Sequence, residues 1–263
     1  MAVLTMKITD KNGNIRYAEK GNDYISLVYT EEYKEGDSIE FESSEKNIHM
    51  VLQFDDALGP AFVYITDNVS FKIPFGEKKI CYSPKAFYGK RHYLYARTAR
   101  EDELKVYRNL ALNVYDQHGD VKCYPHATAN VETRGESIFA AKNAIDGVCE
   151  NRSHGEWPYE SWGINMQDDA YITVDFGREV ESDKVILYTR SDFPHDNWWT
   201  QVTLSFSDGS KIQWDLEKSS LPHVVSFDKK RITWVRLSNL IKAEDPSPFP
   251  ALSQIEVYGC MSI

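Results

Sequence analysis

The sequence has no long hydrophobic run, no excess of basic residues and no closely spaced pair of cysteines, and each absence excludes a class of protein. No apolar stretch approaches the length of a membrane-spanning helix, so no membrane span is predicted. The formal net charge of −10 argues against a nucleic-acid partner or an anionic membrane surface, because both require clustered Lys and Arg. The four cysteines lie far apart and form no Cys-x-x-Cys motif, which excludes a zinc site of that spacing and predicts free, buried thiols.

The N-terminal segment and the cysteines together predict a cellular compartment. The first ten residues contain neither the basic region nor the apolar region of a signal peptide. Free thiols are typical of a reducing compartment. We therefore expect a cytoplasmic protein from the chain as written, and a secreted one if a signal peptide has been removed.

Period-2 alternation of apolar and polar residues runs through the whole chain and predicts an all-β protein. In the second half, for example, Val202, Leu204 and Phe206 alternate with polar residues. One short helix is predicted over 100–109, because Thr98 followed by Glu101 resembles a capping box. Strands are expected at 48–54, 62–65, 69–73, 92–96, 172–176, 184–188, 201–206, 211–216, 224–227, 232–237 and 254–258.

A cluster of turn-forming residues at 115–120, followed by Pro125, marks the best domain boundary. Seven or eight short strands in the second half, separated by turns, are typical of a β-sandwich. The sequence therefore predicts two β-sandwich (jelly-roll) domains. The first covers 1–122 and has no assigned role, and the second covers 123–263.

The segment 189–199 is the most informative part of the sequence, because a hydrophobic core does not need its mixture of residues. Aromatic faces can stack on the C–H faces of a sugar ring, while an Arg, a His and carboxylates can bind its hydroxyl groups. We therefore expect a carbohydrate site here. Adjacent strand residues point to opposite faces, so at least one of the two tryptophans should lie in the core. The candidate residues of this loop are Arg190, Asp192, His195, Trp198 and Trp199.

The second half contains six short motifs in a fixed order. They are Asn-Ala-Ile-Asp-Gly at 143–147, Trp-Gly at 162–163, Ile-Thr-Val-Asp-Phe-Gly at 172–177, Lys-Val-Ile-Leu-Tyr at 184–188, Val-Thr-Leu-Ser-Phe-Ser-Asp-Gly at 202–209 and Ile-Glu-Val-Tyr-Gly at 255–259. In this order they resemble the motifs of discoidin-like (coagulation factor V/VIII type C) domains, which share a galactose-binding-like fold with family-32 carbohydrate-binding modules. The resemblance covers about 125–259 and says nothing about the first half.

The resemblance implies a protein that binds sugars, and less often lipids or proteins, through loops at one end of the second sandwich. It also implies a structural calcium ion near Asp146 and Glu256, since Ca²⁺ prefers oxygen ligands from a tight loop. The alternative is that Asp146 forms an Asx-type turn with Gly147 and that Glu256 faces solvent.

An insertion at 148–161 departs from the usual short loop and adds His154 and Trp157 to the candidate site. In a discoidin-like arrangement this loop and the 189–199 loop leave the sandwich at the same end. We therefore predict that His154 or Trp157 lies within about one sugar-ring width of Arg190 or His195, as a ligand pocket requires.

Two alternatives to a non-catalytic sugar-binding protein are open. The first is a glycan-active hydrolase or lyase, in which two of the carboxylates at 156, 160, 192 and 196 supply the acid and the base. No recognised catalytic motif supports it, so the chain is expected not to be an enzyme. The second alternative is a protein-interaction module whose aromatic loops contact a partner.

Overall fold

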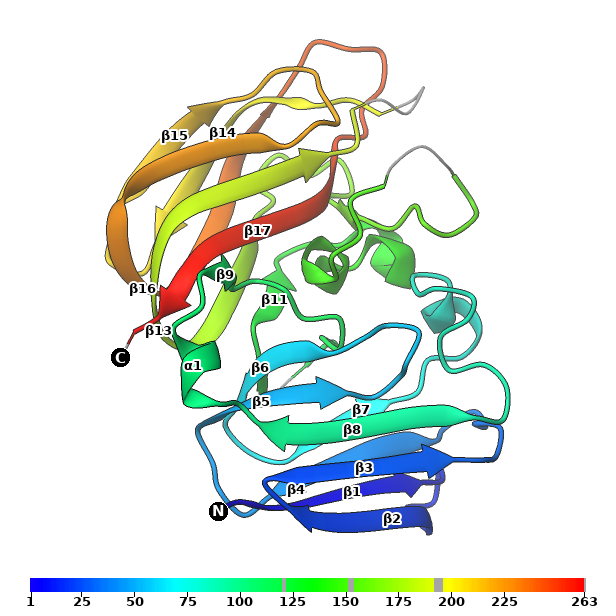
Figure 1. The fold of residues 1–263 in the computed structure, drawn as a ribbon. Coiled ribbons are helices and arrows are strands. Elements are labelled where there is room, and N and C mark those ends of the chain that lie inside the picture. The colour runs from blue at the N-terminus through cyan, green and yellow to red at the C-terminus, as the bar shows by residue number, and fades with distance from the viewer. Residues whose placement is uncertain (120–121, 151–153, 192–195, 263) are drawn as a thin grey trace.

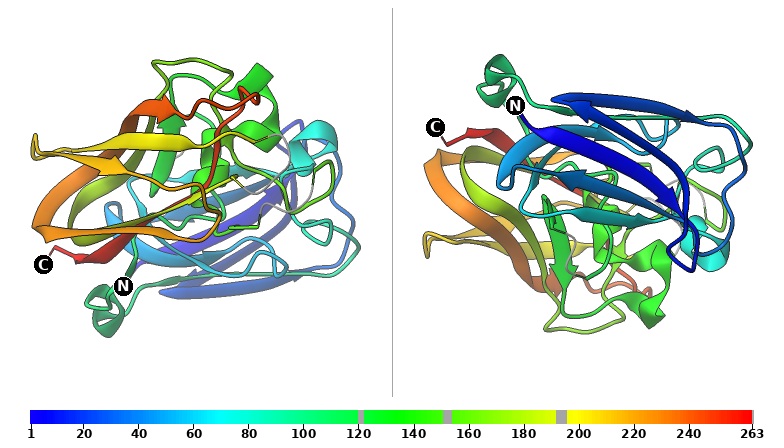
Figure 2. Two further views of the ribbon diagram at one scale, coloured as in Figure 1. Left: turned by 90° about the horizontal axis from the view of Figure 1, so that it is seen from above. Right: turned by 90° about the horizontal axis from the view of Figure 1, so that it is seen from below.

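The structure is a computed structural model that describes residues 1–119, 122–150, 154–191 and 196–262. It is an all-β protein made of two antiparallel β-sandwiches that lie side by side (Figures 1 and 2). The predicted fold class is confirmed. None of the described helices has the length and the apolar character that a membrane span requires.

The N-terminal half forms two facing antiparallel sheets. Strand β3 shows the strict alternation of buried and exposed residues that one core-facing side produces. The first sheet has the order β2-β1-β4-β7, with β2 at Ile15–Asn22, β1 at Val3–Thr9, β4 at Ser38–Ser43 and β7 at Val69–Lys72. The second has the order β10-β6-β5-β8-β3, with β10 at Cys123–Tyr124, β6 at Ala61–Ile65, β5 at Ile48–Gln53, β8 at His92–Thr98 and β3 at Tyr24–Tyr29.

The C-terminal half is built from one antiparallel sheet whose long strands curve around a single core (Figure 1). The predicted strands at 172–176 and 184–188 are parts of one strand, because pairing with its neighbour resumes after register shifts. The sheet order is β12-β17-β13-β16-β14-β15, with β12 at Trp162–Gly163, β17 at Ala251–Met261, β13 at Ile172–Thr189, β16 at His223–Lys242, β14 at Trp199–Phe206 and β15 at Lys211–Asp215. Two short strands add to it: β11 at His126–Ala129 pairs with β13, and β9 at Arg108–Asn109 pairs with β17.

Helical structure in the described residues is limited to single turns. The predicted helix over 100–109 is too long, since α1 covers only Glu101–Leu104 and the chain then pairs with β17 through β9. Its first turn is closed by Glu103, which accepts a hydrogen bond from the backbone N–H of Arg100 at 2.8 Å, so Thr98 is not the capping residue. The 3-10 turns are η1 at Gly76–Lys79, η2 at Thr133–Gly135, η3 at Ser137–Phe139 and η4 at Ala141–Ile145.

Replacing Glu103 with glutamine should lower the free energy of unfolding by about 1–2 kcal/mol at pH 7. Arg97 donates two hydrogen bonds of 2.7 Å to this carboxylate and thereby lowers its pKa to about 2, from an ordinary value of 4.5. A lowered pKa means that the stabilisation is fully present above the ordinary value and is lost as the pH falls through the folded value. Chemical denaturation should therefore show a difference at pH 7 that disappears towards pH 2. The matched variant Glu101→Gln, in the same turn, should behave as the wild type, and an equal loss at both pH values would contradict the prediction.

The two sandwiches have separate hydrophobic cores, but each core takes in residues from the other half of the chain. Ile138 and Tyr159 pack into the N-terminal core, and Leu110 and Ala111 pack into the C-terminal core. The predicted division at 122 and 123 stays a prediction.

The connection between the two halves is fixed by buried polar contacts. Asp116, which is 3% exposed, lies 2.6 Å from Nδ1 of His126 and accepts a hydrogen bond of 2.9 Å from the backbone N–H of Ala127. The side-chain amide of Asn113 donates to the carbonyl oxygen of Pro125 at 2.8 Å. The turn cluster thus holds the start of β11 in place.

All four cysteines are free thiols, as the spacing predicted. Cys81 and Cys123 are buried, while Cys149 and Cys260 are half-buried.

Candidate functional site

Three loops leave the second sandwich at the same end. β12 begins at Trp162, β13 ends at Thr189 and β17 begins at Ala251. Leu252 of β17 pairs with both Trp162 and Thr189, so the three strand ends are neighbours. The segments that precede β12, follow β13 and precede β17 therefore meet in one place, which we call the loop end.

Arg190 ties two of these loops together. Its Nη1 donates a hydrogen bond of 2.6 Å to the carbonyl oxygen of Tyr159, and its Nε lies 3.3 Å from the Asp196 carboxylate. The predicted convergence of the 148–161 and 189–199 loops is thereby confirmed. Arg190 is only 2% exposed, however, so its predicted role as a sugar contact is wrong: the guanidinium is buried and holds protein groups. That His154 or Trp157 lies close to Arg190 or His195 stays a prediction.

The two adjacent tryptophans have opposite environments, as strand alternation predicted. Trp199 is 0% exposed and its ring lies 6.4 Å from that of Trp162 in the core, so its selection as a sugar contact is wrong. Trp198 is half-buried, and the Lys218 ammonium lies 4.9 Å from its ring centroid. Only Trp198 of the pair can take part in a surface site.

The accessible candidates at the loop end are His154 and Trp157. His154 is exposed, with its ring 5.8 Å from that of Tyr159, and Trp157 is half-buried. Asp192 and His195 lie outside the described residues.

The loop before β17 adds an aromatic side chain to this end. Phe249 is 50% exposed, and its carbonyl oxygen accepts a hydrogen bond of 3.3 Å from the backbone N–H of Asn197. Asn197 also donates from its side chain to the carbonyl oxygens of Ala243 and Ser247, at 3.1 and 2.8 Å. The position of Phe249 between two prolines was a sequence signal for an exposed aromatic residue, whereas nothing local predicted Lys218 beside Trp198.

Asp146 forms the tight turn that was the alternative to a calcium ligand. Its Oδ1 accepts a hydrogen bond of 2.8 Å from the backbone N–H of Val148, which is the Asx-type turn expected as the alternative. Burial, and next the charge of Glu160, raise the pKa of the Asp146 carboxyl well above its ordinary value. The charge of the Lys142 ammonium opposes that rise.

Glu256 lies on β17 beside Tyr258, and burial raises the pKa of its carboxyl. The β17 side chain that reaches the Asp-Gly turn is Gln254, whose Oε1 accepts a hydrogen bond of 3.1 Å from the backbone N–H of Gly147. A calcium site that takes in both Asp146 and Glu256 stays a prediction. Among the residues that the structure describes, no group of three or more His, Cys, Asp or Glu side chains is arranged to hold a metal ion.

The carboxylates suggested for a hydrolase give little support to an acid–base pair. Glu160 is 0% exposed, and burial raises the pKa of its carboxyl. Its Oε2 accepts a hydrogen bond of 2.9 Å from the backbone N–H of Tyr159. Glu160 is therefore out of reach of a substrate, and Asp196 is held by Arg190.

The sequence of the C-terminal half assigns the family. Residues 123–258, more than half of the chain, match the family described as "Domain of unknown function (DUF7402)". The chain belongs to this family. No curated protein sequence matches this chain.

Several solved structures are similar to this chain. One is chitosan-binding module 1 from a chitosanase/glucanase of Paenibacillus sp. IK-5, with 21% identity, a TM-score of 0.41, and coverage of 57% of this chain and 98% of that one. A second is the family-32 carbohydrate-binding module of C. perfringens NanJ in complex with galactose, with 18% identity, a TM-score of 0.39, and coverage of 50% and 91%. A third is a fucose-binding module of Streptococcus pneumoniae, with 16% identity, a TM-score of 0.39, and coverage of 57% and 96%.

Proposed function

We propose that the protein binds carbohydrate, without catalysis, through the loop end of its second sandwich. The observation that supports this most is the hydrogen bond from Arg190 to the Tyr159 carbonyl oxygen, which joins the loop that carries His154 and Trp157 to the 189–199 loop. Asn197 of the second loop bonds in turn to the carbonyl oxygen of Phe249. Aromatic faces beside a polar ring are suited to a sugar, whose C–H face stacks while its hydroxyl groups form hydrogen bonds. Arg190 joins Tyr159 to Asp196 before any ligand arrives, which reduces the ordering that these residues need on binding.

Replacing Trp157 with alanine should weaken sugar binding about tenfold or more, because loss of one stacked aromatic ring removes roughly 1–2 kcal/mol of affinity. A single shallow site predicts dissociation constants in the micromolar-to-millimolar range for the wild type, on the order of −4 to −8 kcal/mol. A glycan array should identify the sugar, and calorimetric titration should then measure the variant.

The matched control is Tyr88→Ala, which removes a 76%-exposed aromatic side chain from the N-terminal half. Its affinity should equal that of the wild type. Absence of binding to any glycan, or equal binding by the Trp157 variant, would refute the proposal.

A further inference from the structure

One contact between the two sandwiches consists of two rings of β6 and two guanidinium groups that lie against them. Tyr64 of β6 pairs with His49 of β5, and Phe62 shares the same face by strand alternation. The Arg108 guanidinium of β9 lies 3.9 Å from the ring centroid of Phe62. The Arg178 guanidinium of β13 lies 5.3 Å from the ring centroid of Tyr64. Because β9 and β13 belong to the sheet of the C-terminal half, these cation–π pairs join the two halves.

The two guanidinium groups have few polar partners at this contact. Arg178 donates to the carbonyl oxygen of Phe176 and to the sulfur of Met261, the latter at 3.2 Å. Arg108 donates to the carbonyl oxygen of Glu103. Within the described residues, the Nε of each arginine is buried without a hydrogen-bond partner and neither side chain forms an ion pair. Burial lowers the pKa of both groups, that of Arg178 to about 10. The contact therefore holds positive charge that no ion pair neutralises.

His49 contacts both rings of this cluster. Its ring centroid lies 5.0 Å from that of Tyr64 and 5.8 Å from that of Phe62. Its Nε2 is buried and has no hydrogen-bond partner within the described residues. Burial, then the charge of Arg178 and then that of Arg108, lower the pKa of the imidazole to about 4, from an ordinary value of 6.5. The ring is therefore neutral at pH 7, and a proton would add a third positive charge to the contact.

The carboxylates near this contact act on the guanidinium groups. Glu103 raises the pKa of Arg108, and Asp175 raises that of Arg178. Both charged groups that shift the pKa of His49 are, by contrast, positive. A protonated His49 would therefore be repelled by the two guanidinium groups that hold the halves together.

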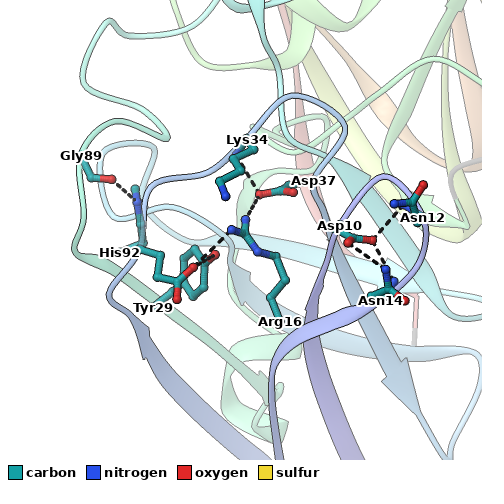
Figure 3. Close-up of polar contacts among 10 residues, drawn as sticks. Asp10, Asn12, Asn14, Arg16, Tyr29, Lys34, Asp37, Gly89 and His92 are labelled. Atoms are coloured by element: carbon teal, nitrogen blue, oxygen red, sulfur yellow. Dashed lines mark hydrogen bonds and ion pairs between the residues drawn. The ribbon is translucent and has the colours of Figure 1, made fainter.

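His92 of the neighbouring strand β8 is a buried histidine with the opposite surroundings. It is 1% exposed, and its Nε2 lies 2.9 Å from the carbonyl oxygen of Gly89 (Figure 3). Its Nδ1 lies 3.9 Å from the Asp55 carboxylate. Each ring nitrogen of His92 thus faces an oxygen acceptor, whereas the buried Nε2 of His49 faces none within the part of the chain that the structure describes.

We propose that His49 makes the contact between the two sandwiches sensitive to acid: protonation places a third positive charge beside Arg108 and Arg178, and the halves separate at this contact. In the separated state water hydrates the imidazole and screens the guanidinium groups, so the ring takes up a proton readily. Acid therefore favours the separated state. This response does not depend on what the loop end binds.

The expected pH range follows from the direction of the shift. A histidine whose pKa is lowered in the closed state stabilises that state above its ordinary pKa of 6.5, and the stabilisation is lost as the pH falls towards 4. Between pH 7 and pH 5 the ratio of separated to closed molecules should rise about tenfold or more.

Nuclear magnetic resonance titration of the wild-type chain tests the first step. The His49 ring should titrate below pH 5. In Arg178→Gln its pKa should move towards the ordinary value, because one of the two repelling charges is gone.

Labelling of Cys123 with dithiodipyridine tests the separation itself. This thiol is 2% exposed and lies close enough to Arg178 to raise its pKa. The labelling rate of Cys123, measured by peptide mass spectrometry and divided by the rate in the urea-unfolded chain at the same pH, should rise about tenfold or more from pH 7 to pH 5. Low concentrations of urea should not change it, which distinguishes separation at this contact from global unfolding.

His49→Gln should keep Cys123 protected at pH 5, because glutamine takes up no proton. The control His223→Gln removes a histidine whose ring lies 3.1 Å from the carbonyl oxygen of Ser219 in the C-terminal half, and it should retain the acid response of the wild type. A His49 pKa of 6 or higher, unchanged protection of Cys123 between pH 7 and pH 5, or an equal acid response in His49→Gln would each overturn the proposal. The titration of the wild-type chain decides alone if the variant folds poorly.

Discussion

Replacing Arg190 with alanine should lower the free energy of unfolding by about 3–5 kcal/mol, because removing one partner of a buried ion pair leaves the other charge uncompensated. The side chains of Arg190 and Asp196 are 3% and 10% exposed, so solvent screens their interaction little. The same substitution also removes the hydrogen bond to the Tyr159 carbonyl oxygen. Urea denaturation monitored by tryptophan fluorescence measures the loss.

The matched control is Arg231→Ala. Arg231 is 64% exposed and pairs with Glu181 at 3.2 Å, so its removal should cost less than about 1 kcal/mol. If Arg190→Ala instead kept the stability of the wild type and lost only sugar binding, Arg190 would be a ligand contact and the structural role assigned to it would be wrong.

Gly259→Ala should destabilise the protein by about 3 kcal/mol, at the upper end of the range for overpacking a folded core. A Cβ at this position would lie 1.9 Å from the carbonyl oxygen of Glu181 on β13. The obstacle is backbone, at the register shift after Ser182, so it cannot move aside as a flexible side chain would. Thermal and urea unfolding should both report the loss.

Gly13→Ala is the informative comparison for this variant. Gly13 has a φ of +79° but nothing within 4 Å of an added Cβ, so only backbone strain of about 1 kcal/mol is expected. Equal losses for the two variants would show that the close approach of β13 and β17 does not restrict residue 259.

Alternation of apolar and polar residues predicted most of the strands that have one buried face, but not all of them. The closing motif at 255–259 lies within β17, and its final glycine is explained by the approach of β13. β2 could not be predicted from alternation, since most of its side chains are exposed. β1 was missed although Leu4, Met6 and Ile8 alternate and are buried, so its signal was present in the sequence.

The sequence predicted which loops form the candidate site, but not which of their side chains are exposed. Composition identified the two loops, and the fold brings them together through Arg190. Whether a charged side chain points outward depends on partners supplied by another loop, here the carbonyl oxygen of Tyr159, and no local pattern contains that information.

Tyr159 connects the loop end to the N-terminal half of the molecule. Its side chain is buried in the N-terminal core, while its backbone carbonyl oxygen anchors Arg190 at the loop end. The segment that matches the family, 123–258, should for this reason not be stable when it is expressed alone. A fragment that begins at residue 123 would contain Ile138 and Tyr159 without the hydrophobic residues of the N-terminal core that surround them. Fusions that use the loop end, where we propose sugar binding, should therefore retain both sandwiches. Substitutions in the N-terminal core should be screened for altered ligand affinity as well as for stability.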